Sequence, residues 1–140
     1  MKTIFFILFL SIACSAMTQR QTTLKVTGIP AVKGQLMIGI YDNAASFPDQ
    51  SKTKKELIVP VNAKTMEIDL TKILGVGEKV AIAVYHDANS NKKLDKNFFG
   101  VPTEHYGFSN DARGVFGPPS FEETAIKVIA GKQVLSIQLK

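Results

Sequence analysis

The sequence predicts an all-β fold, an antiparallel β-sandwich of about seven strands. Short segments alternate apolar and polar residues with the period of two that half-buried strands require. Turns that contain glycine or proline separate these segments. No segment has the long apolar stripe of an amphipathic helix, so a layered β structure is favoured. A small barrel is the alternative arrangement of the same strands.

The first half of the chain contains predicted strands over residues 23–28, 35–42, 57–61 and 65–70. The polar run 43–56 is expected to form a loop with at most one helical turn. Pro60 places the third of these strands at a sheet edge or in a bulge, because proline cannot donate a hydrogen bond to a neighbouring strand.

The second half contains the strongest predicted strand, residues 78–87, in which branched side chains alternate with smaller ones. The residues expected to share one face are Val80, Ile82 and Val84. The last two strand-like segments, 123–130 and 133–139, flank a Gly-Lys turn. They are predicted to form a closing hairpin.

Residues 1–16 have the layout of a secretory signal peptide. Lys2 precedes a short apolar run, and small residues lead up to Ala16. The run is too short to remain as a membrane span, and the mature chain has no second run long enough. Cleavage is expected between residues 16 and 19, which leaves a single domain over residues 20–140. The protein is therefore predicted to be secreted or periplasmic.

Cys14 is the one cysteine of the chain, and it lies within the predicted signal peptide. The mature domain could then form no disulfide and would depend on its packed core. Lipid attachment at Cys14 is an alternative fate. Ser11 argues against it, because bacterial lipoprotein signals usually carry leucine at that place.

The charge balance is mildly basic, with 17 Lys and Arg against 12 Asp and Glu and a formal net charge of +5. Such a balance is ordinary for a solvated surface. The basic residues are not interleaved with aromatic residues along a strand face, as a single-strand binder would require. We therefore expect no nucleic-acid partner.

The long structured loop predicted over residues 86–121 is the most specialised part of the chain. Its first part aligns with positions 1, 3, 5, 7 and 9 of a calcium loop of the EF-hand type. The ligands at these positions would be Asp87, Asn89, Asn91, the backbone carbonyl of Lys93, and Asp95. The alternate spacing of oxygen-bearing side chains makes calcium the candidate cofactor.

Two departures weaken the calcium pattern. Lys92 stands where glycine normally makes the sharp turn, and Phe98 stands where a bidentate Glu normally binds the ion. Glu104 or Asp111 could supply the missing carboxylate by folding back across the loop. Alternatively, the Asp and Asn side chains form Asx turns that bind backbone N–H groups without an ion. The sequence leaves both readings open.

Residues 98–121 contain most of the aromatic side chains that follow the signal segment. Such a loop must either pack this apolar surface as a satellite cluster or expose it to a ligand. The residues proposed for a ligand surface are Glu104, His105, Tyr106, Phe108 and Arg113. Arg113 could instead form an internal pair with Glu104 or Asp111.

Two classes of function follow. The first is a non-catalytic module that binds an envelope or extracellular glycan, peptide or protein through the 86–121 loop. The second is a small envelope hydrolase or metal-dependent enzyme that uses Asp87, Glu104 and His105. The mature chain has neither a cysteine nor a serine in a nucleophile-elbow pattern, and its glycines do not form a phosphate-binding loop. We predict that it is not an enzyme.

Residues 86–125 resemble the secreted bacterial domain-of-unknown-function family 2141. That family's pattern is roughly HDxNxNGxLDxNxxGxPxEGYGFSNxxxGxxGPPxFxxA, and the strands upstream also resemble the family. The resemblance implies a secreted or periplasmic β-sandwich, similar in outline to transthyretin-like or immunoglobulin-like modules, with no established activity. The chain departs from the pattern at Lys92 and His105, where glycine is usual.

Overall fold

The structure is a computed structural model that describes residues 19–140. The predicted signal peptide and Cys14 lie outside the described residues. The strands are β1 (Gln21–Thr27), β2 (Gln35–Tyr41), β3 (Lys55–Pro60), β4 (Met66–Asp69), β5 (Lys79–Asp87), β6 (Tyr106–Phe108), β7 (Ile126–Lys127) and β8 (Lys132–Gln138). The helices are single turns, η1 (Gln50–Lys52), η2 (Ser109–Asp111) and α1 (Phe121–Thr124). None of these helices is long and apolar enough to cross a membrane.

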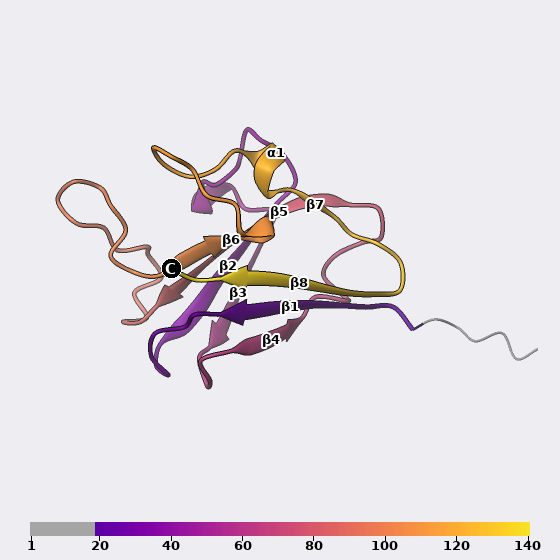
Figure 1. Cartoon of the computed structure of the whole chain (residues 1–140), viewed down its shortest axis with the longest axis horizontal. Coiled ribbons are helices and arrows are strands. Elements are labelled where there is room, and N and C mark those ends of the chain that lie inside the picture. The colour runs from indigo at the N-terminus through magenta and orange to yellow at the C-terminus, as the bar shows by residue number, and fades with distance from the viewer. Residues whose placement is uncertain (1–18) are drawn as a thin grey trace, which may run out of the picture.

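The strands form two sheets, which confirms the predicted all-β sandwich (Figure 1). The smaller sheet has the order β4-β1-β8. The larger sheet has the order β3-β2-β5-β6, and β7 also pairs with β5. All pairs are antiparallel except β1 with β8, which run parallel. Pro60 ends β3 at the edge of the larger sheet, where its missing N–H disrupts no internal ladder.

The main core lies between the sheets and follows the period of two along each strand. On β5, Val80, Ile82 and Val84 are buried in this core, as their alternation predicts. The neighbouring strand β2 and the facing strands β1 and β8 contribute further fully buried side chains, among them Leu36, Ile38, Leu24, Val26 and Ile137. The outward side chains of β2 and β5 are consequently free to build a second surface on the other face of the larger sheet.

The predicted closing hairpin is wrong. β7 pairs with β5 in the larger sheet, whereas β8 pairs with β1 in the smaller one. The Gly131 turn between them has φ of +85° and carries the chain from one sheet to the other. Turn chemistry is local, but the choice of partner strand depends on which sheet buries the apolar face, and here Val128 and Leu135 both reach the shared core.

Ser109 joins the short strands on the outer side of β5. β6 pairs with residues 83–85 and β7 with residues 79–80, which leaves Ile82 between them. The N–H of Ile82 donates to Oγ of buried Ser109 at 2.9 Å, and that hydroxyl donates to the carbonyl of Thr124 at 2.6 Å. The hydroxyl thus replaces a missing strand partner and holds α1 against the sheet.

Candidate functional site

Asp87, the last residue of β5, anchors the loop that follows. Its side chain is fully buried, and its carboxylate accepts three hydrogen bonds. Oδ2 accepts from the side-chain amide of Gln35 at 2.7 Å and from the N–H of Lys92 at 2.8 Å. Oδ1 accepts from the N–H of Asn91 at 3.0 Å. Burial of a carboxylate is unfavourable without such donors. The hydrogen bonds therefore hold the backbone of Asn91 and Lys92 close to Asp87, so the chain turns back tightly after β5.

Residues just before β2 also contact the end of β5. His86 is buried, and its Nε2 lies 2.7 Å from the carbonyl oxygen of Lys33. Because a carbonyl only accepts, this Nε2 carries the proton. A Cβ at Gly34 would lie 2.2 Å from the backbone oxygen of Asp87. Only glycine therefore allows the two backbones to approach this closely.

The remaining side chains of the predicted calcium set converge on Asp95. Nδ2 of Asn89 donates to Asp95 Oδ2 at 2.7 Å, and Nδ2 of Asn91 donates to both carboxylate oxygens at 2.9 and 3.0 Å. The side-chain oxygens of Asn89 and Asn91 accept from the backbone N–H two residues onward. These are Asx turns, so the loop has an internal hydrogen-bond network of its own.

Glu104 lies across this loop and joins its two ends. Oε1 accepts from the N–H of Ala88, and Oε2 accepts from the N–H of Asp95, both at 3.1 Å. Asp111 lies elsewhere and accepts from the N–H of Gln138. Lys92 has φ of +63°, the left-handed conformation that glycine would adopt most easily. Within residues 19–140, no three His, Cys, Asp or Glu side chains are grouped closely enough to hold a metal by themselves.

A groove of about 560 Å³ lies on the outer face of the larger sheet. Its floor is low because Gly39 and Ala83 are paired side by side on β2 and β5. The next pair along these strands, Met37 and Tyr85, is larger and bounds the floor on one side. The aromatic ring of Phe108, opposite Ala83 on β6, bounds it on another.

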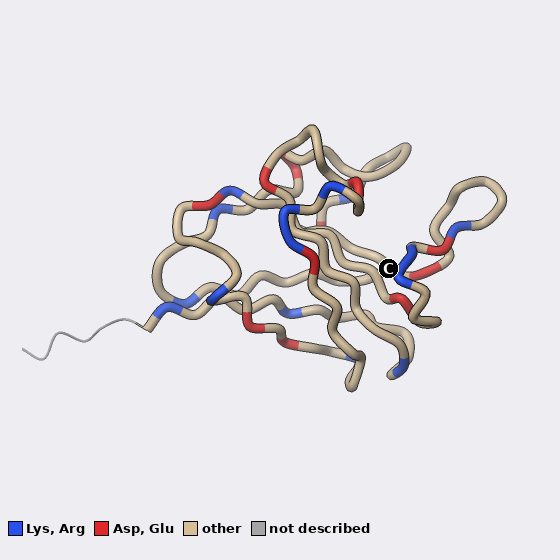
Figure 2. Tube along the Cα trace, turned by 180° about the vertical axis from the view of Figure 1, so that it is seen from behind, with Lys and Arg blue, Asp and Glu red and all other residues tan. Residues whose placement is uncertain are grey.

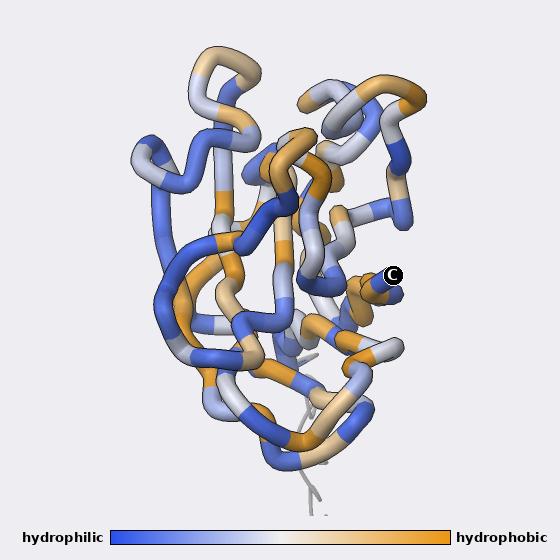
Figure 3. Tube along the Cα trace, turned by 90° about the vertical axis from the view of Figure 1, so that its left-hand side faces the viewer, coloured by the Kyte–Doolittle hydropathy of each residue, from blue (hydrophilic) through white to orange (hydrophobic). Residues whose placement is uncertain are grey.

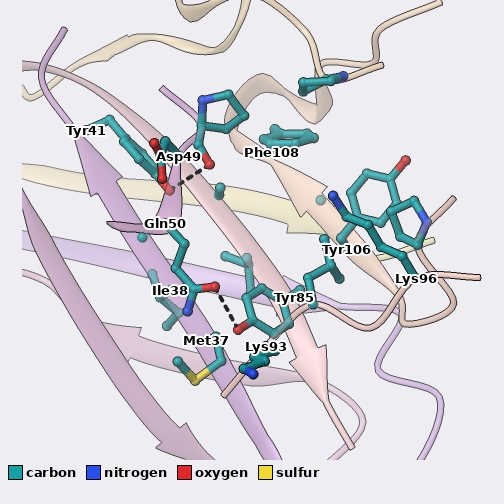
Figure 4. A pocket seen from close by; sticks show the side chains of 18 of the residues that line it. Met37, Ile38, Tyr41, Asp49, Gln50, Tyr85, Lys93, Lys96, Tyr106 and Phe108 are labelled. Atoms are coloured by element: carbon teal, nitrogen blue, oxygen red, sulfur yellow. Dashed lines mark hydrogen bonds between the residues drawn. The ribbon is translucent and has the colours of Figure 1, made fainter. Parts of the chain in front are cut away.

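The loops on either side of the sheet form the walls of the groove (Figure 4). Gln50, from the loop before β3, accepts from the hydroxyl of Tyr85 at 3.3 Å and donates to the backbone oxygen of Lys92 at 3.3 Å. Gln50 therefore connects this wall to the Asp87 loop. The opposite wall contributes Lys93, Leu94, Lys96, Gly100, Pro102, Gly117 and Pro118.

The three tyrosines of the chain, Tyr41, Tyr85 and Tyr106, all line this groove. Burial raises the pKa of Tyr41 to about 12, and the nearby carboxylates of Asp49 and Glu56 act in the same direction. Burial likewise raises the pKa of Tyr85 to about 12, although its hydrogen bond to Gln50 opposes the shift. Both phenols are therefore neutral hydrogen-bonding groups at physiological pH.

A family comparison covers the same part of the chain. Residues 24–136 match DUF2141, described as an uncharacterized protein conserved in bacteria. The chain belongs to this family. The match begins in β1 and ends in β8, so the DUF2141 region includes both sheets, the Asp87 loop and the groove. It confirms the resemblance found in the sequence. No curated protein and no solved structure matches the chain.

The structure of this DUF2141 chain separates the five residues predicted for a ligand surface. Tyr106 and Phe108 line the groove, but Glu104, His105 and Arg113 do not. His105 is exposed, and its carbonyl accepts from the N–H of His86. Four residues that line the groove were not predicted from the sequence: Gly39, Ala83, Tyr85 and Gln50. The available signal was the row of small residues on the outward face of two predicted strands.

Arg113 could have formed an internal pair with Glu104 or Asp111, but this alternative is wrong. Its guanidinium donates to the carbonyl oxygens of Tyr106, at 3.2 Å, and Gln138, at 2.9 Å, and it lies over the Tyr106 ring. Arg113 thus ties the loop after η2 to the ends of β6 and β8.

The aromatic side chains of the 86–121 loop divide into two groups. Phe108 and Phe121 pack edge-to-face against Phe47, next to Tyr41, in a satellite cluster outside the larger sheet. This is the satellite cluster, one of the two arrangements that the sequence predicted for the aromatic residues of the loop. By contrast, Phe98, Phe99 and Phe116 are exposed to solvent.

Proposed function

We propose that this DUF2141 protein is a secreted or periplasmic, non-catalytic module that binds a glycan in the groove on the larger sheet. The observation that carries the proposal is the groove itself, with its small apolar floor at Gly39 and Ala83 and its aromatic sides. Its volume of about 560 Å³ lies within the range of sites for small organic ligands.

Side chains, not backbone, would recognise the ligand. The backbone groups of β2 and β5 are already paired within the sheet, so an extended peptide could not add to them as a further strand. The groove instead offers the amide of Gln50, the hydroxyl of Tyr85 and the ammonium of Lys96. Such groups suit the hydroxyls of a sugar ring whose flatter face lies on the floor. A peptide side chain is the second candidate occupant.

The geometry of the alternative catalytic residues supports a binding role. Both oxygens of Asp87 and of Glu104 accept hydrogen bonds within the loop, and neither residue lines the groove. His105 lies outside the groove as well. A general acid or base must reach the substrate, whereas Asp87 and Glu104 instead give the loop its shape.

Calcium is a second proposal, for the loop alone. Asp87, Asn89, Asn91 and Asp95 lie in one connected network, and their oxygens are of the type that calcium prefers. With only two carboxylates among them, binding would be weak, in the millimolar range of extracellular calcium modules. The ion would stiffen the wall of the groove that contains Lys93 and Leu94.

The test uses tyrosine fluorescence, because the chain has no tryptophan and all three tyrosines line the groove. Glycans and short peptides are titrated into the protein, and each bound ligand is then recovered and weighed by mass spectrometry. We expect a saturable change with glycans, and recovery of the glycan unaltered. A shortened or hydrolysed product would establish an enzyme instead.

The matched variants are Ala83→Leu, which fills the floor, and Ala130→Leu, which adds the same atoms at an exposed turn. Lys96→Ala, on the exposed rim, changes the site without altering the floor. Ala83→Leu should abolish binding and Ala130→Leu should leave it unchanged. Equal binding by all three variants and the natural chain would place the ligand elsewhere and overturn the proposal.

A further inference from the structure

Two loops project from the end of the molecule opposite the N-terminal side (Figures 1 and 2). We call them the Phe98 tip, residues 96–102, and the Phe116 tip, residues 113–118. The side chains of Phe98, Phe99 and Phe116 are 97%, 85% and 103% exposed. In Figure 3, where this end faces the viewer, hydrophobic stretches occur on loops as well as on strands. Large apolar side chains held in water at such positions mark a surface that binds something.

The backbone of the Phe98 tip forms several hydrogen bonds within the tip. The N–H of Asn97 donates to the carbonyl of Val101 at 2.8 Å, and the N–H of Gly100 donates to the carbonyl of Asn97 at 2.9 Å. The side-chain oxygen of Asn97 accepts from the N–H groups of Phe99 and Val101. Four N–H groups of the tip thus have acceptors within it, which lowers the cost of bringing the tip to a lipid surface.

The Phe116 tip is a tight turn as well. A Cβ at Gly114 would lie 2.0 Å from the backbone oxygen of Gly117, so glycine at position 114 allows these two stretches of backbone to come this close. Pro118 follows directly and has no N–H to satisfy. Val115 and Phe116 are thus presented at the end of a narrow turn and not on a broad face.

Basic side chains lie behind the Phe98 tip. Lys92, Lys93 and Lys96 are exposed, and none of them forms an ion pair within residues 19–140. The acidic groups nearby, Asp95 and Glu104, have their oxygens turned onto donors within the loop. The ammonium groups of Lys92, Lys93 and Lys96 are therefore available to an anionic surface, while residues 97–102 and 114–118 carry no charge.

We propose that the two tips dock this protein on an anionic membrane surface. The phenylalanines would enter the headgroup region of the bilayer, and Lys92, Lys93 and Lys96 would remain at the level of the lipid phosphates. A bilayer fits the observed shape because it accepts two separate narrow tips. A specific protein partner would need one continuous, complementary surface of about 1,000 Å² or more.

Docking of this kind would also orient the groove. Gly100 and Pro102 of the Phe98 tip, and Gly117 and Pro118 of the Phe116 tip, all line it. The groove therefore lies between the two tips and would open close to the lipid headgroups. This inference does not depend on which ligand the groove binds.

The experiment places single tryptophans in the full chain, which has none of its own. The variants are Phe98→Trp and Phe116→Trp at the tips and Ile129→Trp at an exposed turn outside both tips. Each is mixed with vesicles of phosphatidylcholine alone or with phosphatidylglycerol added, both with brominated acyl chains. We expect a blue shift and quenching for both tip variants with the anionic vesicles, and neither for the Ile129→Trp variant.

A second series combines the Phe98→Trp reporter with Lys92, Lys93 and Lys96 changed to Gln. Three basic side chains near an anionic surface predict a loss of affinity of roughly a hundredfold. All variants carry the same residues 1–18, so membrane binding through that segment would affect the tip variants and the Ile129→Trp variant alike. If the tryptophan fluorescence of the tip variants neither shifted nor was quenched when anionic vesicles were added, the proposal would be overturned. So would tip emission that shifts with protein concentration alone, which would indicate a second copy of the chain.

Discussion

The Asp87 loop, residues 87–95, and the two aromatic tips are parts of one segment, yet they treat their side chains in opposite ways. In the Asp87 loop, buried and exposed polar groups bind each other, and Gln35 and Glu104 complete the network from outside. In the tips, by contrast, the large side chains face water, and four N–H groups of the Phe98 tip have acceptors within it. Hydrogen bonds between side chains and backbone fix the conformation of the Asp87 loop, whereas the tips present exposed aromatic side chains to another surface.

The strongest test of this contrast is Asp87→Ala. The change leaves two backbone N–H groups and the Gln35 amide without their acceptor in a buried place. We expect the free energy of unfolding to fall by about 3 kcal/mol, measured by urea denaturation. Asp42→Ala, at an exposed carboxylate, is the control and should change it by less than about 0.5 kcal/mol. Equal small effects would show that the loop is not anchored through Asp87.

Titration to high pH tests how far the tyrosine side chains that line the groove are shielded from solvent. The pKa values of Tyr41 and Tyr85 are raised to about 12 in the folded chain, from an ordinary value of 10.0. The folded state therefore holds protons that the unfolded state has lost. Stability should be complete below pH 10 and decline as the pH rises toward 12.

Ultraviolet absorbance of tyrosinate measures this titration directly. Tyr41→Phe and Tyr85→Phe should each remove one late-titrating group and reduce the loss of stability at high pH. If the natural chain titrates as three ordinary tyrosines, the floor of the groove is wetter than its burial indicates.

Glu104 is the next contact to remove. Glu104→Ala takes the acceptor from the N–H groups of Ala88 and Asp95, but the site is only partly buried. The expected loss of unfolding free energy is therefore smaller, about 1–2 kcal/mol. His105→Ala, at the neighbouring exposed position, should stay within about 0.5 kcal/mol. A larger effect at His105 would reverse the roles assigned to the two residues.

The sequence predicted the features that follow from a local alternation of residues. It did not predict those that depend on which strands pair with each other. Alternation along residues 78–87 gave the correct core face, because Val80, Ile82 and Val84 each obey the same local rule. The separation of β7 from β8 could not be predicted from their turn, since long-range burial selects the partner strand.

The candidate site divides in the same way. The spacing of Asp87, Asn89, Asn91 and Asp95 is local, and these side chains do form one network. The groove arises only when Gly39 and Ala83 become neighbours on different strands and Gln50 folds over them from a third segment. No single stretch of sequence contains that arrangement.

Calcium binding would add stability to the Asp87 loop, the region whose side chains already bind each other. An ion that binds only the folded loop stabilises it by about 1.4 kcal/mol at ten times the dissociation constant. Thermal melts in millimolar calcium and in chelator measure the effect, and Asp95→Asn should reduce it. A melting temperature that stays the same in both solutions would leave the hydrogen bonds as the whole explanation of the loop.

The smallest expected effect on stability belongs to the tips. Phe98→Ser and Phe116→Ser should change the free energy of unfolding by less than about 0.5 kcal/mol, because side chains that are exposed in the folded state contribute little to it. Phe121→Ser is the matched control: the same substitution in the satellite cluster should cost about 3 kcal/mol. If the tip changes destabilised the fold as much as the change at Phe121, the tip phenylalanines would have to pack against the protein in solution. Only a tip that is neutral to folding is free to be used for binding, so this near-zero result is what the membrane proposal requires.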